Sequence, residues 1–279
     1  MRWEDRGTSG DVEDRRGASG GGGYGRLGLG GFLLLLVLSV VFKRNLFTLL
    51  DAGGDGGGGS APTASVPQSP EEEKLVHFVS FVLDDVQHTW TREFQESGQR
   101  YERAKLVLFS DAVRSGCGFA EAAMGPFYCP ADHKVYVDLG FYKELRNRFG
   151  APGDFAQAYV IAHEVGHHVQ SLLGLEERMS AARERRPDQA PALSVRYELQ
   201  ADCLAGVWAH STQQRNILEA GDVEEALGAA AAVGDDRIQG QTTGRVKPET
   251  WTHGSSQQRM QWFNVGFQKG QVQECDTLR

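Results

Sequence analysis

The sequence predicts an α+β fold over residues 71–279 with a single transmembrane helix ahead of it. Three observations lead to this prediction. An uncharged apolar run occupies residues 27–42, short β-branched and aromatic runs follow at 105–138, and helical spacing dominates from there onward. With 279 residues, the chain is long enough for one sizeable domain and an appendage, but too short for two large domains.

The start of the chain divides into three predicted segments. Residues 1–26 are polar and glycine-rich, which predicts a disordered tail because such a composition is poor material for a core. Residues 27–50 hold the apolar run, the pair Lys43 and Arg44 and a second apolar patch, and together predict one membrane anchor. Residues 51–70 are rich in Gly, Ala, Ser and Pro, which predicts a flexible linker.

The charges around the apolar run predict how the anchor is oriented. Five arginines precede the run, and Lys43 and Arg44 are the basic residues close behind it, so the positive-inside rule places the tail in the cytoplasm. The rest of the chain is then outside. A cleaved signal peptide is the alternative, but the polar tail is long for one and no A-x-A site closes the run.

The folded part is expected to begin near Glu71. Apolar residues recur at helical spacing from Leu75 to Trp90, which predicts a long amphipathic helix at the start of the domain. Three short runs bounded by Gly and Pro then predict strands at residues 105–110, 125–129 and 134–138.

Charge and cysteine content exclude some classes of protein. The formal net charge is -8 and there is no long Lys/Arg run, so nucleic acid is not an expected partner, since phosphate binding needs a basic surface. The four cysteines form no C-x-x-C pair, which argues against a cysteine-rich structural zinc site. In an oxidising compartment they could form two disulfides.

A predicted helix at residues 154–173 carries a motif with metal chemistry, His163-Glu164-Val165-Gly166-His167. Two histidines four residues apart lie about 40° from each other around a helix, so both rings can face one ion. Glu164 lies beside them, where it can take a proton from a metal-bound water. The alternative is a surface helix with two ordinary histidines. However, the flanking residues are apolar, and a buried helix would desolvate these groups without compensation.

A catalytic zinc ion usually has three protein ligands and an open position. A third histidine at the spacing H-E-x-x-H-x-x-G-x-x-H is excluded, because Gln170 and Leu173 occupy the required positions. A second predicted helix, at residues 194–210, carries Glu198 and Asp202 one turn apart. We therefore expect Glu198 to be the third zinc ligand. Asp202 is expected to accept a hydrogen bond from the other ring nitrogen of a ligating histidine.

Motifs along almost the whole chain resemble those of the bacterial neutral zinc metallopeptidases. The matching stretches are MRWEDR, DVEDRRG, GPFYCPAD, KVYVDLGFY, AYVIAHEVGHHVQ, YELQADCLAGVWA, GDDRIQ and WTHGSSQQR. The resemblance implies a zincin-like domain in which His163, His167 and Glu198 bind Zn²⁺ and Glu164 is catalytic. It also implies a bacterial membrane protein that acts on a peptide or protein substrate.

Two further motifs have less definite roles. Residues 234–237, Gly-Asp-Asp-Arg, are interpreted as a turn that ends a helix. His253, in the motif Thr-His-Gly-Ser, is a candidate donor to the oxyanion of the tetrahedral intermediate. A packing or capping role for His253 is the alternative, and the sequence does not decide between them.

The cysteines and one strand are expected near the substrate. Cys117 and Cys129 bracket a glycine-rich stretch that a disulfide would pin, and Cys203 is expected to pair with Cys275. A free, buried Cys203 is the alternative. In zinc peptidases of this architecture, an edge strand above the metal helix pairs with the substrate backbone. Residues 134–138 are the expected edge strand.

The function predicted from the sequence is peptide-bond hydrolysis by a zinc-activated water at the outer face of a bacterial cytoplasmic membrane. Two alternatives stay open. One is a zinc hydrolase acting on a non-protein amide of the cell envelope, which a wide polar groove without a strand edge would favour. The other is a non-catalytic, membrane-anchored binding module on the same fold, against which the presence of Glu164 counts.

Overall fold

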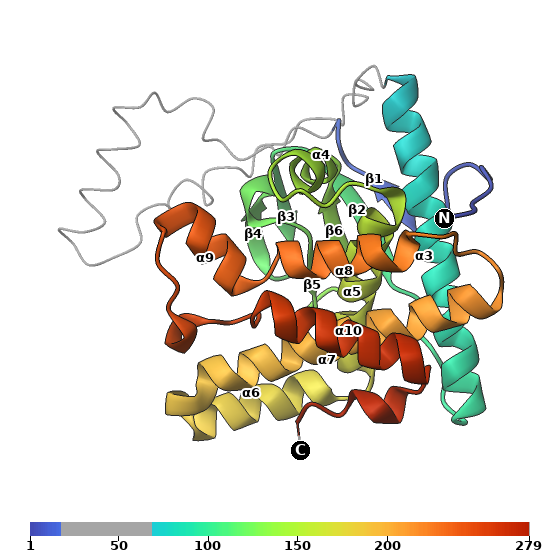
Figure 1. Ribbon diagram of the computed structural model, residues 1–279. Helices are drawn as coiled ribbons and strands as arrows, with labels where there is room; N and C mark the ends of the chain where they lie inside the picture. Colours follow the sequence, from blue (N-terminus) through green and yellow to red (C-terminus); the bar gives the residue numbers. More distant parts are fainter. Residues whose placement is uncertain (18–68, 279) are drawn as a thin grey trace, which may run out of the picture. The chain divides into compact units, whose positions relative to one another are not determined.

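The computed structural model describes residues 1–17 and 69–278 (Figure 1). The predicted anchor at 27–50 and nearly all of the predicted linker lie outside the described residues. The strands are β1 (Val12–Asp14), β2 (Lys105–Phe109), β3 (Ala112–Ser115), β4 (Gly118–Glu121), β5 (Phe127–Cys129) and β6 (Lys134–Asp138). The α-helices are α3 (Pro70–Glu96), α4 (Gly140–Asn147), α5 (Asp154–Leu172), α6 (Leu175–Arg185), α7 (Ala190–Gln214), α8 (Asp222–Ala232), α9 (Asp235–Thr243) and α10 (Ser256–Lys269). The predicted mixture of strands and helices is confirmed.

Four strands form one sheet in the order β1-β2-β6-β5, and only β5 runs antiparallel to its neighbour. Both faces of β2 are buried, because alternate side chains enter two different apolar clusters. Leu106 and Leu108 face the main core, whereas Val107 and Phe109 face a small cluster under the β3–β4 hairpin. Burying such side chains contributes about 1.5–3 kcal/mol each, so the hairpin and the helices fix the sheet from both sides.

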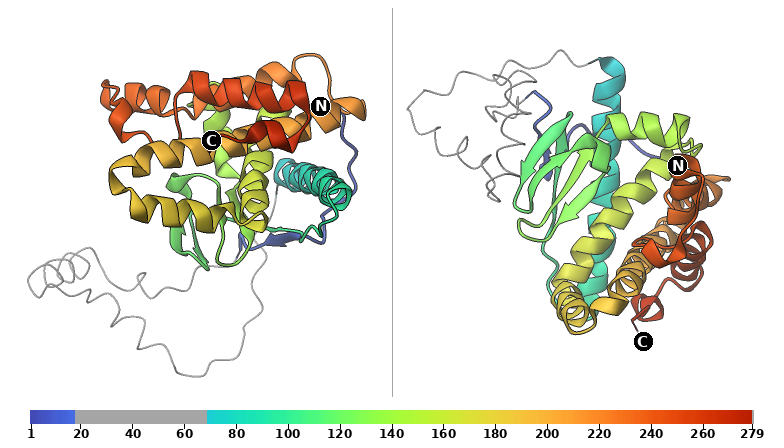
Figure 2. Two further views of the ribbon diagram at one scale, coloured as in Figure 1. Left: turned by 90° about the horizontal axis from the view of Figure 1, so that it is seen from below. Right: turned by 90° about the vertical axis from the view of Figure 1, so that its left-hand side faces the viewer.

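Helix α5 is the central helix of the described residues. It packs against β5 and β6 on one side and against α7 and α8 on the other, with α3 beside it. The sheet, the α3/α5 pair and the α7/α8/α10 group therefore form three layers, which Figure 2 shows most clearly in its right-hand view. Being buried on all sides explains why α5 is apolar around most of its circumference.

Helices α7 and α10 pack with their backbones in close contact. A Cβ atom at Gly206 of α7 would collide with the carbonyl oxygen of Phe263, and one at Gly266 of α10 would collide with that of Cys203. Glycine is required at both positions for this approach. The close packing brings α10 near the middle of α7, where the predicted residues Glu198 and Asp202 lie.

The prediction of a disordered tail is wrong for the described N-terminal residues. Strand β1 pairs in parallel with β2, and Met1 is buried with its amino nitrogen 2.8 Å from Asp154. Two acidic residues of this segment pair with lysines of the domain. Lys105 lies 2.7 Å from Asp11, and Lys134 lies 2.7 Å from Glu13. A strand of three residues is too short to show a periodic pattern in the sequence.

This pairing also corrects the predicted topology. A cytoplasmic tail and an extracytoplasmic domain would place β1 and β2 on opposite sides of a membrane, but the two strands are neighbours in one sheet. A cytoplasmic β1 with an extracytoplasmic β2 is therefore incompatible with this sheet. None of the helices in residues 1–17 and 69–278 has the length and apolar character needed to span a bilayer.

Both predicted disulfides are present. Cys117–Cys129 ties the turn of the β3–β4 hairpin to the end of β5, and Cys203–Cys275 ties the C-terminal segment to α7. The alternative of a free Cys203 is wrong. Each bridge closes a loop of the unfolded chain and so restricts the unfolded state.

Candidate metal centre

Helices α5 and α7 bring the three predicted ligands together. One ligand atom each of His163, His167 and Glu198 lies within 4.8 Å of the other two. The Oε2 atom of Glu198 lies 3.2 Å from Nε2 of His163 and 3.5 Å from Nε2 of His167. Gly166, between the histidines, permits this geometry, because a Cβ atom there would lie 3.1 Å from the Ala201 carbonyl oxygen of α7.

Each histidine is oriented by an acceptor on its other ring nitrogen. Nδ1 of His163 lies 2.9 Å from Oδ1 of Asp202, and Nδ1 of His167 lies 2.7 Å from Oε1 of Gln170. Both Nδ1 atoms can therefore carry the proton, which leaves both Nε2 atoms as unprotonated ligands facing Glu198. Partners of this kind fix the tautomer and raise the basicity of metal-bound histidines. The sequence predicted this role for Asp202 but not for Gln170.

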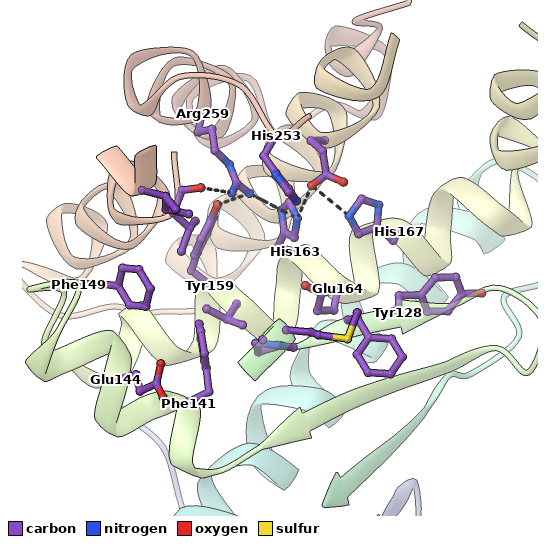
Figure 3. A pocket seen from close by; sticks show the side chains of 18 of the residues that line it. Tyr128, Phe141, Glu144, Phe149, Tyr159, His163, Glu164, His167, His253 and Arg259 are labelled. Atoms are coloured by element: carbon purple, nitrogen blue, oxygen red, sulfur yellow. Dashed lines mark hydrogen bonds and ion pairs between the residues drawn. The ribbon is translucent and has the colours of Figure 1, made fainter. Parts of the chain in front are cut away.

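Asp202 is fully buried and held by two other buried groups. Arg259 of α10 donates to its two oxygens, with distances of 2.8 Å from Nε and 2.9 Å from Nη2, and the Tyr159 hydroxyl donates to Oδ1. The Arg259 guanidinium compensates the carboxylate, which would otherwise be costly to bury. Figure 3 shows Arg259, Tyr159 and His163 close to one another.

The charges around the three ligands suit a cation. Burial alone would lower the pKa of His163, but Asp202 and Glu198 outweigh it and raise that pKa to about 9. Burial opposes ionisation of Glu198, yet attraction by His167 and His163 keeps its pKa well below the usual value. Two imidazoles and an ionised carboxylate form a zinc donor set, and Asp202 and Gln170 orient the two imidazoles. The residues present therefore fit a zinc ion.

The three ligands and Glu164 line a cleft of about 490 Å³. Glu164 is 8% exposed and lies on α5 directly beside His163, with its carboxylate at the cleft (Figure 3). The remaining lining residues come from α5 itself, from the segment before and within β5, from α4 and the loop after it, from the segments around α9, and from α10. They include Met124, Phe127, Tyr128, Phe141, Phe149, Val160, Val233 and Ile238.

His253 also lines the cleft, and Asp235, a residue of the predicted helix-ending turn, holds the loop that carries it. Oδ2 of Asp235 accepts hydrogen bonds from the backbone N–H groups of Thr252, His253 and Gly254, at 2.7–3.0 Å. Its Oδ1 lies 3.3 Å from Nδ1 of His253. The prediction of a helix-ending turn at 234–237 is thus wrong, because Asp235 begins helix α9 and its side chain organises the loop that carries His253.

The predicted edge strand is also corrected. Strand β6 lies between β2 and β5, so its backbone groups are used on both sides. The edge of the sheet that borders the cleft is β5, and residues 125–128 line the cleft. Strand order depends on long-range pairing, which short apolar runs do not encode.

A comparison with protein families matches residues 1–278 to the family described as "Putative neutral zinc metallopeptidase". The chain belongs to this family. This confirms the resemblance found in the sequence motifs. The family also supports zinc as the metal and a hydrolase as the class of protein.

The chain is also similar to individual bacterial proteins. The "Uncharacterized protein YpfJ" of Escherichia coli strain K12 is 49% identical over 287 residues, which cover 100% of this chain and 99% of the relative. The "Uncharacterized protein Rv2575" of Mycobacterium tuberculosis strain H37Rv is 50% identical over 189 residues, covering 64% of this chain and 63% of the relative. No solved structure matches the chain.

Proposed function

We propose that this member of the family is a zinc-dependent peptidase that hydrolyses peptide bonds with Glu164 as general base. The observation that carries the proposal is the cluster of His163, His167 and Glu198 beside Glu164 in one cleft. Zinc, when bound, supplies Lewis-acid polarisation of the peptide carbonyl and lowers the pKa of an attacking water.

Residues of the protein transfer the proton and orient the zinc ligands. Glu164 takes the proton of the attacking water on its carboxylate and passes it to the nitrogen of the leaving amine. Asp202 and Gln170 hold the two histidine rings in place throughout. No covalent bond to the protein forms in this cycle.

His253 is proposed to donate a hydrogen bond to the oxyanion of the tetrahedral intermediate. Its side chain is half exposed, lines the cleft and points toward His163 (Figure 3). The hydrogen bond with Asp235 outweighs burial and raises the pKa of His253, which favours the protonated, donating ring. Donors of this kind typically contribute about 10²–10³-fold to kcat.

The edge strand β5 favours a peptide over other amides. An extended substrate backbone can add to a free sheet edge, and β5 borders the cleft on that side. Aromatic side chains from β5, α4 and the loop after α4 line the cleft and suit the side chains of a peptide. A wide polar groove without a strand edge would have favoured a cell-wall amide, whereas this cleft has a strand edge and several aromatic lining residues.

Localisation outside the cytoplasm is part of the proposal. Two disulfides in one domain suit an oxidising compartment. Attachment to the membrane through residues 27–50 remains part of the proposal. Because β1 pairs with β2, residues 1–15 and the peptidase domain are then both on the extracytoplasmic side. The apolar run at 27–42 supports the attachment.

The proposal is tested by incubating the purified full-length chain with a diverse peptide mixture, with and without a chelator. We expect new peptide termini, detected by mass spectrometry, that chelator abolishes and added zinc restores. Unchanged peptides in the presence of about one bound zinc per chain would refute peptidase activity and leave the two alternatives, a zinc hydrolase of a non-protein amide and a non-catalytic binding module.

A further inference from the structure

His168 follows the ligand His167 on α5, is fully buried and has no part in the proposed chemistry. Its Nε2 lies 2.7 Å from the carbonyl oxygen of Glu102. A carbonyl only accepts hydrogen bonds, so Nε2 carries the proton and Nδ1 is the acceptor in the neutral ring. The hydroxyl of Tyr128 lies 3.1 Å from this Nδ1 and therefore donates to it.

The Tyr128 oxygen has a second partner. Nδ1 of His133, in the turn between β5 and β6, lies 3.1 Å away. Because the Tyr128 proton goes to His168, His133 is the donor in this bond. A directed chain of hydrogen bonds thus runs from His133 through Tyr128 and His168 to Glu102, and such chains strengthen each member.

The alternation of side chains makes Tyr128 the link between β5 and α5. Phe127 stacks on Tyr136 with ring centroids 4.8 Å apart, and Cys129 is bonded to Cys117, both in the cluster on the far face of the sheet. Tyr128 points to the opposite face, toward α5. The Tyr128 side chain therefore sets the distance between β5 and the metal-binding helix α5.

We propose that Tyr128 and His168 are positioning residues that hold β5 where an extended peptide paired with it lies in line with Glu164 and the zinc ligands. The proposal rests on the proposed peptidase function. Within residues 1–17 and 69–278, no strand pairs with the outer edge of β5. The occupant of this edge is the backbone of the peptide substrate, since residues 125–128 line the cleft that contains Glu164. A shift of about 1 Å between the substrate and the reacting groups can reduce the rate about 10²-fold.

The test compares Tyr128→Phe with the matched control Tyr136→Phe in the full-length chain. Each change deletes one partly or fully buried hydroxyl, but the Tyr136 hydroxyl donates to Asp132 at 2.6 Å, away from α5. Zinc content is measured with kcat/KM on an extended peptide and on a blocked dipeptide too short to pair with β5. Hydrogen exchange of the backbone amides at residues 127–129 gives a readout that does not depend on activity.

We expect Tyr128→Phe to keep its zinc, because all three ligands are untouched. Its kcat/KM should fall about 10–100-fold on the extended peptide and much less on the dipeptide, with faster exchange at 127–129. Tyr136→Phe should leave the ratio between the two substrates unchanged. Equal ratios or equal exchange rates in the two variants would overturn the proposal. A wild-type chain that holds zinc but cleaves neither substrate would overturn the peptidase function instead, while hydrogen exchange would still test the link between β5 and α5.

Discussion

The carboxylates Glu198 and Asp202 lie one turn apart on α7 and do different work. Glu198 faces the Nε2 atoms of both histidines, whereas Asp202 reaches Nδ1 of His163 and is fully buried against Arg259. The same residue type can therefore serve as ligand or as support, depending on which ring nitrogen it faces.

This division predicts different zinc contents for two variants. Glu198→Ala removes a ligand oxygen and should lose most of the zinc and all activity. Asp202→Asn keeps the shape of the side chain and removes its charge, so zinc affinity or activity should fall by about 10–100-fold, with rescue by added zinc. Elemental analysis of both proteins checks this. If Glu198→Ala retained zinc and Asp202→Asn lost it, Asp202 would be the ligand and Glu198 the supporting residue.

The pairing of His253 with Asp235 predicts a pH effect. Because that contact raises the pKa of His253, the protonated ring persists to higher pH than a free imidazole, and its contribution is lost as pH rises through the raised pKa. In Asp235→Asn, the alkaline fall in kcat should therefore begin at lower pH. His253→Ala should reduce kcat about 10²–10³-fold. In that background, Asp235→Asn should cause no further shift of the pH profile, and a further shift would contradict the role of His253.

At the residue scale, local spacing revealed what lies on one helix. His163 and His167 lie one turn apart on α5, and Glu198 and Asp202 lie one turn apart on α7, so periodicity alone indicated that each pair shares a face. Asp235 was missed because its partners are 17–19 residues away, in a loop with no periodic pattern. Two consecutive acids at a helix start carry no signal for such a contact.

At the scale of elements, the positions of the predicted strands at 105–110, 125–129 and 134–138 agree with β2, β5 and β6. Their order in the sheet was not predictable, and the expected edge strand was therefore wrong. Helix packing likewise cannot be predicted from one helix alone. The requirement for glycine at position 206 follows only from the contact between α7 and α10.

This packing predicts a stability difference between two glycine substitutions. Gly206→Ala places a methyl group against the Phe263 carbonyl and should destabilise the fold by about 1–3 kcal/mol or more through forced backbone shifts. Gly228→Ala in α8 meets nothing within 4 Å and should be neutral or stabilise by up to about 1 kcal/mol. Chemical denaturation of both variants measures this, and equal midpoints would contradict the close α7–α10 contact.

On the scale of the whole molecule, the N-terminal residues complete the sheet of the folded domain. Residues 1–15 and the described residues from Ser69 onward belong to one compact unit. Composition alone did not suggest this, because residues 1–17 look like a polar tail.

The shared sheet predicts that both termini face the same compartment. An epitope inserted after Gly17 and another after Arg279 should be equally accessible to antibody or protease in intact spheroplasts, because β1 stays paired with β2. A cytoplasmic protein serves as the control for lysis. Accessibility at one site and protection at the other would mean that β1 is not part of the sheet in the cell.

The central claim is that Glu164 acts as the base beside a zinc ion held by three other residues, and one variant tests it most directly. Glu164→Gln leaves all three ligands unchanged, so we expect about one zinc per chain, as in the wild type, together with the loss of measurable peptide hydrolysis. Zinc content and turnover should be measured on the same preparations of both proteins. Hydrolysis by Glu164→Gln at the wild-type rate with zinc bound would contradict the account.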